Sequence, residues 1–116
     1  SAHLGPILVE GVGGWRVPLD STHTVQEWAQ ELGLPVVVVC RATLGTLNHT
    51  LLTVDSIRQA GLKVPGIIMN FHGATEDEAS RTNPTILEEL TKVPVARFPE
   101  NAVVWPIPAW LSAALA

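Results

Sequence analysis

Short apolar runs alternate with amphipathic stretches along this chain, and the two patterns predict different secondary structures. The apolar runs are rich in Val, Ile and Leu, which favour strands, and lie at 6–10, 36–40, 64–70 and 93–96. Apolar residues at helical spacing predict helices at 24–32, at 48–60, from 83 onward and at 109–116. Strands that alternate with helices of this length form parallel sheets. The pattern therefore predicts an α/β fold, a parallel sheet with flanking helices.

Capping residues predict where the helices begin and end. Thr24 and Glu27 have the spacing of a capping box, and Gly33 supplies the end of that helix. Asn48 is expected to cap the second helix, with Leu47 and Leu52 at staple spacing, and Asn83-Pro84 to start the third. These positions divide the chain into successive strand and helix units.

The first two apolar runs predict strands at different positions in the sheet. Residues 6–10 end in an acid and a glycine, which is typical of a buried strand that opens onto a loop. Residues 36–40 are apolar on both faces, which predicts the centre of the sheet. Cys40 ends that run and is expected to be a core residue rather than a nucleophile.

Composition narrows the class of protein. The chain has 116 residues, of which 47% are apolar and 16% charged, and this predicts one globular domain over 1–116. A formal charge of −4 without a basic patch argues against nucleic-acid binding. No run of about 20 apolar residues is present to span a membrane. A single cysteine fits a reducing compartment, so we expect a cytoplasmic protein.

Candidate ligand-binding residues follow the strands, because parallel sheets bind ligands beyond the carboxyl ends of their strands. Glu10 is there either a Mg²⁺ ligand or a solvated residue where the strand surfaces. Asn70 could pair with an adenine edge. The glycines at 11–14 lack the third glycine of a dinucleotide fingerprint, because Arg16 occupies its place.

The segment 44–49 ends a loop and opens a helix. A helix N-terminus is a natural site for a substrate carboxylate, and the Asn48 amide could contribute to it. The alternative is an ordinary cap in which Asn48 bonds its own backbone. Both interpretations stay open on this motif alone.

Two kinds of site have no motif in this sequence. A phosphate-binding loop of the form G-x-x-x-x-G-K-S/T is absent, because neither Lys63 nor Lys92 follows a glycine. His23, His49 and His72 lack the short spacing of a zinc site. The chain also opens without Met and almost directly on a strand, so we expect a fragment of a larger protein.

Three motifs in this order resemble the dethiobiotin synthetase family. They are the stretch 7–19, which contains E-G-V-G-G-W, the stretch 44–53, which reads L-G-T-L-N-H-T-L-L-T, and Asn70. The resemblance covers residues 6–99 and implies a P-loop NTPase-like fold. It also implies a homodimeric enzyme that carboxylates 7,8-diaminopelargonate with CO₂, phosphorylates the carbamate with MgATP and closes the ureido ring of dethiobiotin.

The resemblance assigns roles to particular residues. Glu10 is expected to hold Mg²⁺, and Gly45, Thr46 and Asn48 to reach the substrate bound mainly by the other subunit. The ATP-binding residues implied are Glu10, Gly11, Val12, Gly13, Asn70, Phe71, Phe98, Pro99 and Glu100. No catalytic residue carries over, because the family's phosphate loop, catalytic lysine and first metal-binding aspartate belong to an N-terminal half with no counterpart here. The chain alone is therefore expected to be inactive.

Two other functions remain as alternatives. One is a related amidoligase of the cobyrinic acid synthase type, or the related domain of some phosphotransacetylases, against which Trp15 and the Asn48-His49 pair argue. The other is a non-catalytic binding or regulatory module that kept the sheet, an interpretation favoured by the missing phosphate loop.

Overall fold

The computed structural model describes residues 7–73, 78–99 and 104–115. Three short strands alternate with helices, as the apolar runs predict. The elements in chain order are α1 (Val25–Leu32), β1 (Val38–Arg41), α2 (Thr46–Gln59), β2 (Ile67–Asn70), α3 (Glu78–Thr91), β3 (Val95–Phe98) and α4 (Ala109–Leu115).

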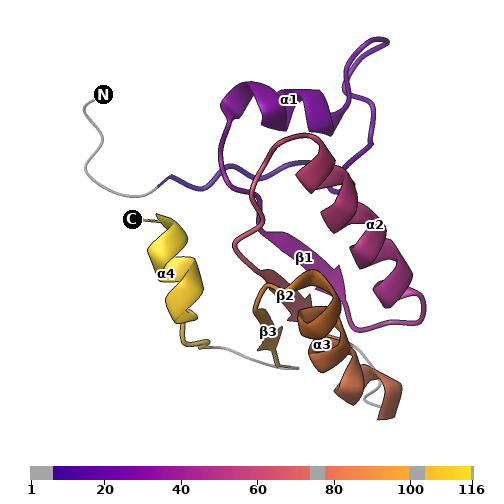
Figure 1. The fold of residues 1–116 in the computed structure, drawn as a ribbon, viewed down its shortest axis with the longest axis vertical. Helices are drawn as coiled ribbons and strands as arrows, with labels where there is room; N and C mark the ends of the chain where they lie inside the picture. Colours follow the sequence, from indigo (N-terminus) through magenta and orange to yellow (C-terminus); the bar gives the residue numbers. More distant parts are fainter. Residues whose placement is uncertain (1–6, 74–77, 100–103, 116) are drawn as a thin grey trace.

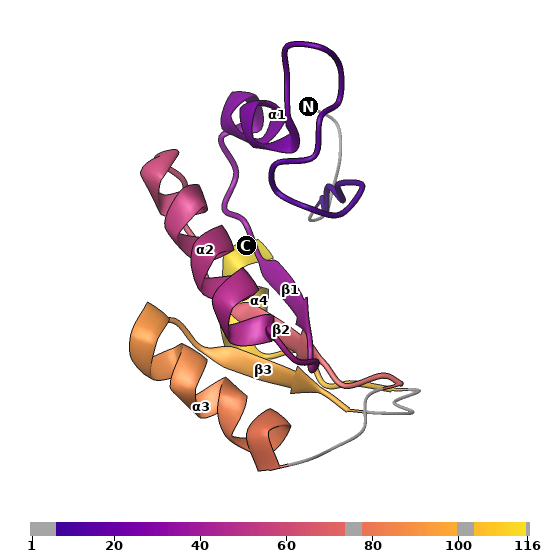
Figure 2. The ribbon, with the colours of Figure 1, turned by 90° about the vertical axis from the view of Figure 1, so that its right-hand side faces the viewer.

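The strands form one parallel sheet in the order β1-β2-β3. Its register pairs Val38 with Ile67 across the first two strands, and Ile67 with Val95 across the next two. Helices α2 and α3 cover one face, whereas α4 lies on the opposite side of the strands (Figures 1 and 2). The predicted α/β class, a parallel sheet with flanking helices, is therefore confirmed.

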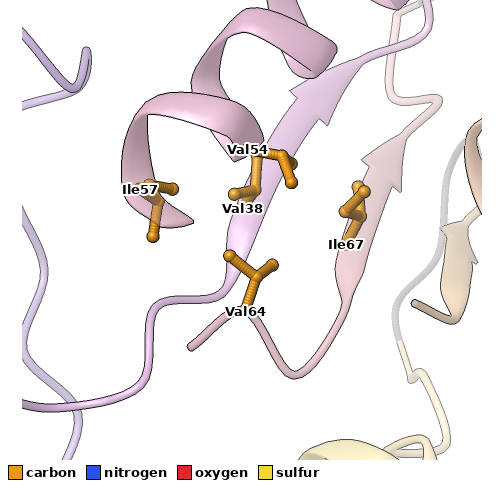
Figure 3. Close-up of a cluster of buried hydrophobic side chains, with 5 residues drawn as sticks. All are labelled: Val38, Val54, Ile57, Val64 and Ile67. Atoms are coloured by element: carbon orange, nitrogen blue, oxygen red, sulfur yellow. The ribbon is translucent and has the colours of Figure 1, made fainter. Parts of the chain in front are cut away.

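The core lies between this sheet and the helices α2 and α3. One cluster joins Val54 and Ile57 of α2 to Val38 and Ile67 of the sheet, with Val64 closing it below (Figure 3). A second cluster packs Leu87 of α3 against residues at the carboxyl ends of the strands, namely Ala42, Met69 and Phe71. Because every one of these side chains is at most 8% exposed, the two clusters hold the strand ends in fixed positions.

The buried strand expected at 6–10 is not observed. Residues 7–10 are not part of the sheet, and the side chains of Ile7, Leu8 and Val9 are exposed. A buried parallel strand needs a hydrogen-bonded neighbour, and no described strand pairs with this segment. The apolar pattern is therefore present without the partner that would bury it.

The position of the 36–40 run in the sheet also differs from the expectation. The strand itself is confirmed, although it begins at Val38, but β2 rather than β1 is the central strand of the described sheet. Val39 of β1 is 64% exposed. Apolar residues on both faces thus predicted a central strand, whereas in the described residues β1 has an open outer edge.

Helix boundaries agree with the expectations at α1 and differ at α2 and α3. The α1 capping box is present, since the Thr24 N–H donates to Glu27 Oε2 at 2.8 Å, and Gly33 ends the helix in the left-handed conformation. Helix α2 begins after Gly45, whose φ of 89° suits glycine, so Asn48 is not its cap and the expected staple does not form there. Helix α3 begins at Glu78 and therefore contains Pro84, which is buried.

The two C-terminal elements are close to those expected. Strand β3 spans Val95–Phe98, two residues beyond the predicted run, and helix α4 occupies Ala109–Leu115. Trp110 of α4 lies directly on Gly66, where a Cβ atom would come within 2.7 Å of the indole ring. None of the helices in the described ranges is long and apolar enough to cross a membrane.

Candidate functional site

An open groove of about 500 Å³ runs along the outer side of β1, and we call it the β1 groove. The chain segment before α1 borders it on one side, and β1 with the residues before it on the other. Its lining residues are Glu10, Gly11, Gly13–Trp15, Val25, Val36–Arg41, Thr43, Thr46, His49, Thr50, Thr53 and Ile57. Two regions that the sequence analysis singled out, the stretch after residue 9 and the start of α2, therefore meet here.

Glu10 and the glycines after it form the N-terminal side of the β1 groove. The carboxylate is exposed, as are Gly11, Gly13 and Gly14. Gly13 and Gly14 both have φ near +92°, a conformation that other residues rarely adopt. The segment therefore bends and leaves its backbone open to a ligand, whereas Val12, 73% exposed, does not line the groove.

Trp15 holds this segment against the rest of the fold. Its indole Nε1 donates to Ser56 Oγ of α2 at 2.9 Å, and its carbonyl accepts the Gln26 N–H of α1 at 3.1 Å. The ring packs against the first core cluster. The glycine segment is thus fixed at its C-terminal end by α1 and α2, although it belongs to no regular element.

The start of α2 supplies the other candidate residues. Thr46 is 4% exposed and lines the groove, and its N–H donates to the Thr43 carbonyl at 3.2 Å. Helical bonding then begins with the His49 N–H on the Gly45 carbonyl at 3.1 Å. Gly45 and Asn48 are exposed beside the groove rather than in its lining. The first-turn N–H groups give this end of α2 the partial positive charge that favours a carboxylate.

Cys40 and Thr50 form part of the floor of the β1 groove. Burial raises the pKa of the Cys40 thiol above its ordinary value, so the neutral thiol is favoured. This agrees with the expectation of a core cysteine. Thr50 is 2% exposed, and among the described residues its Oγ1 has no hydrogen-bond partner of ordinary geometry. The Cys40 thiol beside it is only a weak hydrogen-bonding group.

The expected base-binding residues lie at the carboxyl ends of β2 and β3. Asn70 pairs in register with Phe98, and the Phe71 N–H donates to the Phe98 carbonyl at 2.9 Å. Asn70 Oδ1 accepts the His72 N–H at 2.9 Å, so this oxygen already has a partner and the amino group points the other way. The Phe71 ring is 5% exposed, with the Arg97 guanidinium 4.3 Å above its centre.

The structure brings together some of the expected site residues and not others. One group lies at the carboxyl ends of β2 and β3, namely Asn70, Phe71 and Phe98. A second group lines the β1 groove, namely Glu10, Gly11, Gly13 and Thr46. Pro99 follows β3 and is exposed, and Glu100 lies outside the described residues. His49 was not among the expected site residues, yet it lines the groove one turn after Thr46. The spacing of three residues on one helix face is the signal that could have found it.

The donor set of the site suits a magnesium ion held mainly by a nucleotide. In the described part of the chain no three His, Cys, Asp or Glu side chains gather as a metal site. Mg²⁺ keeps several waters and is commonly bound by one or two carboxylates together with substrate phosphates. The exposed Glu10 carboxylate, next to glycines with an open backbone, fits that requirement.

Comparisons with known proteins give the following relatives. The family model described as "AAA domain" matches residues 1–106. An ATP-dependent dethiobiotin synthetase of Haloferax mediterranei is 45% identical over 103 residues, which are 88% of this chain and 44% of that protein. The corresponding enzyme of Acidiphilium cryptum is 40% identical over 110 residues, 95% of this chain and 48% of that protein. That of Bacillus subtilis is 43% identical over 88 residues, 76% and 38% of the two chains.

These matches confirm the resemblance to dethiobiotin synthetases that the three motifs indicate. The chain spans about half the length of the curated relatives it matches. The similarity therefore covers nearly all of this chain and only part of each relative.

Proposed function

Because the chain belongs to the AAA domain family, we propose that it supplies one part of the active site of an ATP-dependent dethiobiotin synthetase. The observation that carries the proposal is the β1 groove, whose lining includes both Glu10 with its neighbouring glycines and Thr46 at the start of α2. A carboxylate next to exposed glycine backbone suits a phosphate that carries a bound metal ion. A helix N-terminus suits the carboxylate of a substrate.

The proposed reaction of the whole enzyme has three steps. An amine of 7,8-diaminopelargonate takes up CO₂ and becomes a carbamate. The γ-phosphoryl group of ATP passes to a carbamate oxygen, which leaves ADP. The second amine then attacks the activated carbonyl carbon and expels phosphate, which closes the ureido ring. Mg²⁺ bound with ATP neutralises charge on the phosphate oxygens.

Each candidate residue in this chain has a role in that proposal. Glu10 holds Mg²⁺, and the backbone at 11–13 approaches the phosphates. The substrate carboxylate is held at the start of α2 by Gly45, Thr46 and Asn48, in a homodimer where α2 of one subunit reaches the other's substrate.

The adenine is held at the carboxyl ends of β2 and β3. Because Asn70 Oδ1 already accepts the His72 N–H, its amino group is the part that donates to a ring nitrogen of the base. Phe71 contributes through its backbone, since its ring is buried, while Phe98 and Pro99 border the base. Glu100 completes this proposed set.

A chimeric enzyme tests the proposal. This chain replaces the matched 110 residues of the Acidiphilium cryptum synthetase, and dethiobiotin and ADP are measured with diaminopelargonate, bicarbonate and MgATP. We expect both products in equal amounts. Glu10→Gln should lower kcat/KM by about 100-fold or more, because a bound metal is worth several kcal/mol in the transition state. Asn48→Ala should raise the KM for diaminopelargonate about 10-fold, the loss of one hydrogen bond to a charged group.

Glu31→Gln is the matched control, because Glu31 is an exposed acid on α1 outside the groove. A folded chimera that makes no dethiobiotin overturns the proposal and favours a non-catalytic module. An active chimera in which Glu10→Gln behaves like Glu31→Gln removes the metal role from Glu10.

A further inference from the structure

A second open groove, of about 600 Å³, lies at the amino ends of β1 and β2. We call it the α4 groove, because α4, on the face of the sheet opposite α2 and α3 (Figure 2), forms one wall. The segment between α2 and β2 contributes most of the other lining residues. The α4 groove and the β1 groove share no residue, so this surface is separate from the candidate site.

Most of the lining of the α4 groove is apolar. Leu62, Val64 and Pro65 contribute to it from the segment before β2, and Trp110 from α4. Val64 belongs to the first core cluster, and the Trp110 ring lies on the backbone of Gly66. These contacts fix the apolar surface in place, so a ligand with an apolar part can be shielded from water there without rearrangement of the core.

Two cationic side chains, Arg58 and Lys63, also line the α4 groove, and none of its lining residues is acidic. Arg58 Nη2 donates to the Thr91 carbonyl at 2.6 Å, which holds the guanidinium in place and leaves its other N–H groups for a ligand. Lys63 is exposed, and in the part of the chain that the structure describes neither cation pairs with a carboxylate. In a chain with a formal charge of −4, this groove is therefore locally complementary to an anion.

The end of α2 does not cancel this positive charge. The C-terminus of a helix carries a partial negative charge on its last carbonyls. Here the carbonyls of residues 56–58 accept N–H groups from residues 60–62, at 2.9–3.2 Å. They are thus bonded within the chain, and the two cationic side chains determine the charge of the groove.

The backbone along the α4 groove is poorly suited to a peptide. Pro35 and Pro65 have no N–H group, and the Leu62 N–H donates to the Ile57 carbonyl at 3.2 Å. The Lys63 carbonyl accepts the N–H of residue 36 at 2.8 Å. An extended peptide binds largely through main-chain hydrogen bonds, and this groove offers few. A ligand must therefore rely on the cationic side chains and the apolar surface.

We propose that the α4 groove binds a small molecule that carries one carboxylate on an uncharged apolar chain or ring. The carboxylate contacts Lys63 and Arg58, and the apolar part lies along Leu62 and Trp110. A volume of about 600 Å³ is within the range of small-molecule sites. The inference uses neither the β1 groove nor the proposed reaction, so it does not depend on the proposed function.

Titration of the complete 116-residue chain with 4-phenylbutyrate, followed by NMR of the N–H groups, tests this site. We expect a Kd on the order of 1 mM, which is typical of a ligand of about a dozen atoms. Shifts should be largest at Leu62, Lys63 and the Trp110 indole, whereas Gly11 and Thr46 of the β1 groove serve as references. The neutral 4-phenylbutanamide should bind about 10-fold more weakly, because it lacks the charge that the cations favour.

Two pairs of variants test the charge and the apolar wall separately. Lys63→Gln should raise the Kd of 4-phenylbutyrate about 3-fold, the worth of one exposed ion pair. Lys92→Gln removes the chain's other lysine, which is exposed and outside the groove, and should leave the Kd unchanged. Ala113→Phe fills the groove from α4 and should raise the Kd about 10-fold or more. Ser112→Phe, at an exposed neighbouring position outside the lining, is its control.

The inference is overturned if 4-phenylbutyrate does not bind, if it binds no better than 4-phenylbutanamide, or if the shifts are confined to the β1 groove. Equal affinity of folded Lys63→Gln and Lys92→Gln also overturns it. So does binding to phosphatidylglycerol vesicles in place of 4-phenylbutyrate, because the anion is then a membrane surface. If circular dichroism shows that the free chain is unfolded, the same titrations are made on the chimera. Because binding is measured, a chimera that makes no dethiobiotin and still binds 4-phenylbutyrate removes the proposed function alone.

Discussion

The two outer strands of the sheet, β1 and β3, have the same length but different surroundings. On β3, Glu88 and Trp105 bond the outward backbone groups at 3.0 Å each, and α3 packs against the strand end through Leu87, which is fully buried. On β1, Val39 is 64% exposed and the outward backbone borders an open groove. The same parallel sheet therefore has one edge protected against further pairing and one edge suited to it.

The difference follows from where the covering residues lie in the sequence. Glu88 precedes Val95 by seven residues, and Trp105 follows Arg97 by eight, so short connections bring both side chains to β3. The residues that border the outer side of β1 come from the segment before α1, which is held there mainly through Trp15. Local sequence completes one edge, whereas the segment that borders the other edge lies far in sequence from the residues that bond β1 and is held by a contact between residues 41 apart.

The largest expected contrast between the two edges is in stability. Leu87→Ala, on the β3 side, should lower the free energy of unfolding by about 2–5 kcal/mol, because it leaves a cavity in the second core cluster. Val39→Ala, on β1, should change it by no more than about 0.5 kcal/mol, because that side chain is mostly in solvent. Urea unfolding of both variants measures the two values. Similar losses would mean that β1 is buried in solution and that the edges do not differ.

Local patterns predicted most of the fold. The β-branched runs located all three observed strands, and Thr24, Glu27 and Gly33 predicted both ends of α1. The predictions were wrong where contacts between residues distant in sequence determine the structure. Residues 7–9 have the apolar character of a strand but pair with no strand in the described part of the chain. Helix α3 extends through Pro84, which is buried on the same face as Leu87 three residues later.

The roles expected for the candidate site residues stay predictions, and only their positions in the fold can be compared with what the sequence indicated. Strand ends and the α2 start were recognisable, and Asn70 and Phe98 do meet across β2 and β3. The sequence did not indicate that Gly45, rather than Asn48, begins α2, because glycine at φ 89° competes with an asparagine cap. It also did not indicate that Thr46 and His49 border the same groove as Glu10, which depends on the Trp15–Ser56 hydrogen bond, 41 residues apart in sequence.

A smaller loss of stability should follow when the side chain that bonds the outer edge of β3 is removed. Glu88→Ala removes the acceptor for the Val95 N–H and should cost about 0.5–1.5 kcal/mol, the typical worth of one hydrogen bond. It also opens the edge, so we expect concentration-dependent self-association in sedimentation velocity. Glu88→Gln keeps an acceptor oxygen at the same reach and is the matched control. If Glu88→Ala associates no more than Glu88→Gln at any concentration, this contact does not protect the β3 edge.

The smallest expected effect is a pH-dependent change in the free energy of unfolding, and it comes from Cys40 of β1. Burial raises the pKa of the Cys40 thiol, so the folded chain holds the proton at a pH where the unfolded chain has lost it. The folded state then binds more protons than the unfolded state, and stability falls as pH rises above the ordinary thiol value of about 8.5. The decline should end above the raised pKa of the folded state. Unfolding in urea from pH 7 to pH 10, compared with Cys40→Ala, isolates this contribution. Alkylation by iodoacetamide at pH 8 should likewise be slower than for a free cysteine, because the neutral, partly buried thiol is favoured. Alkylation as fast as that of a free cysteine would mean that this side of β1 is more open to solvent than its burial indicates.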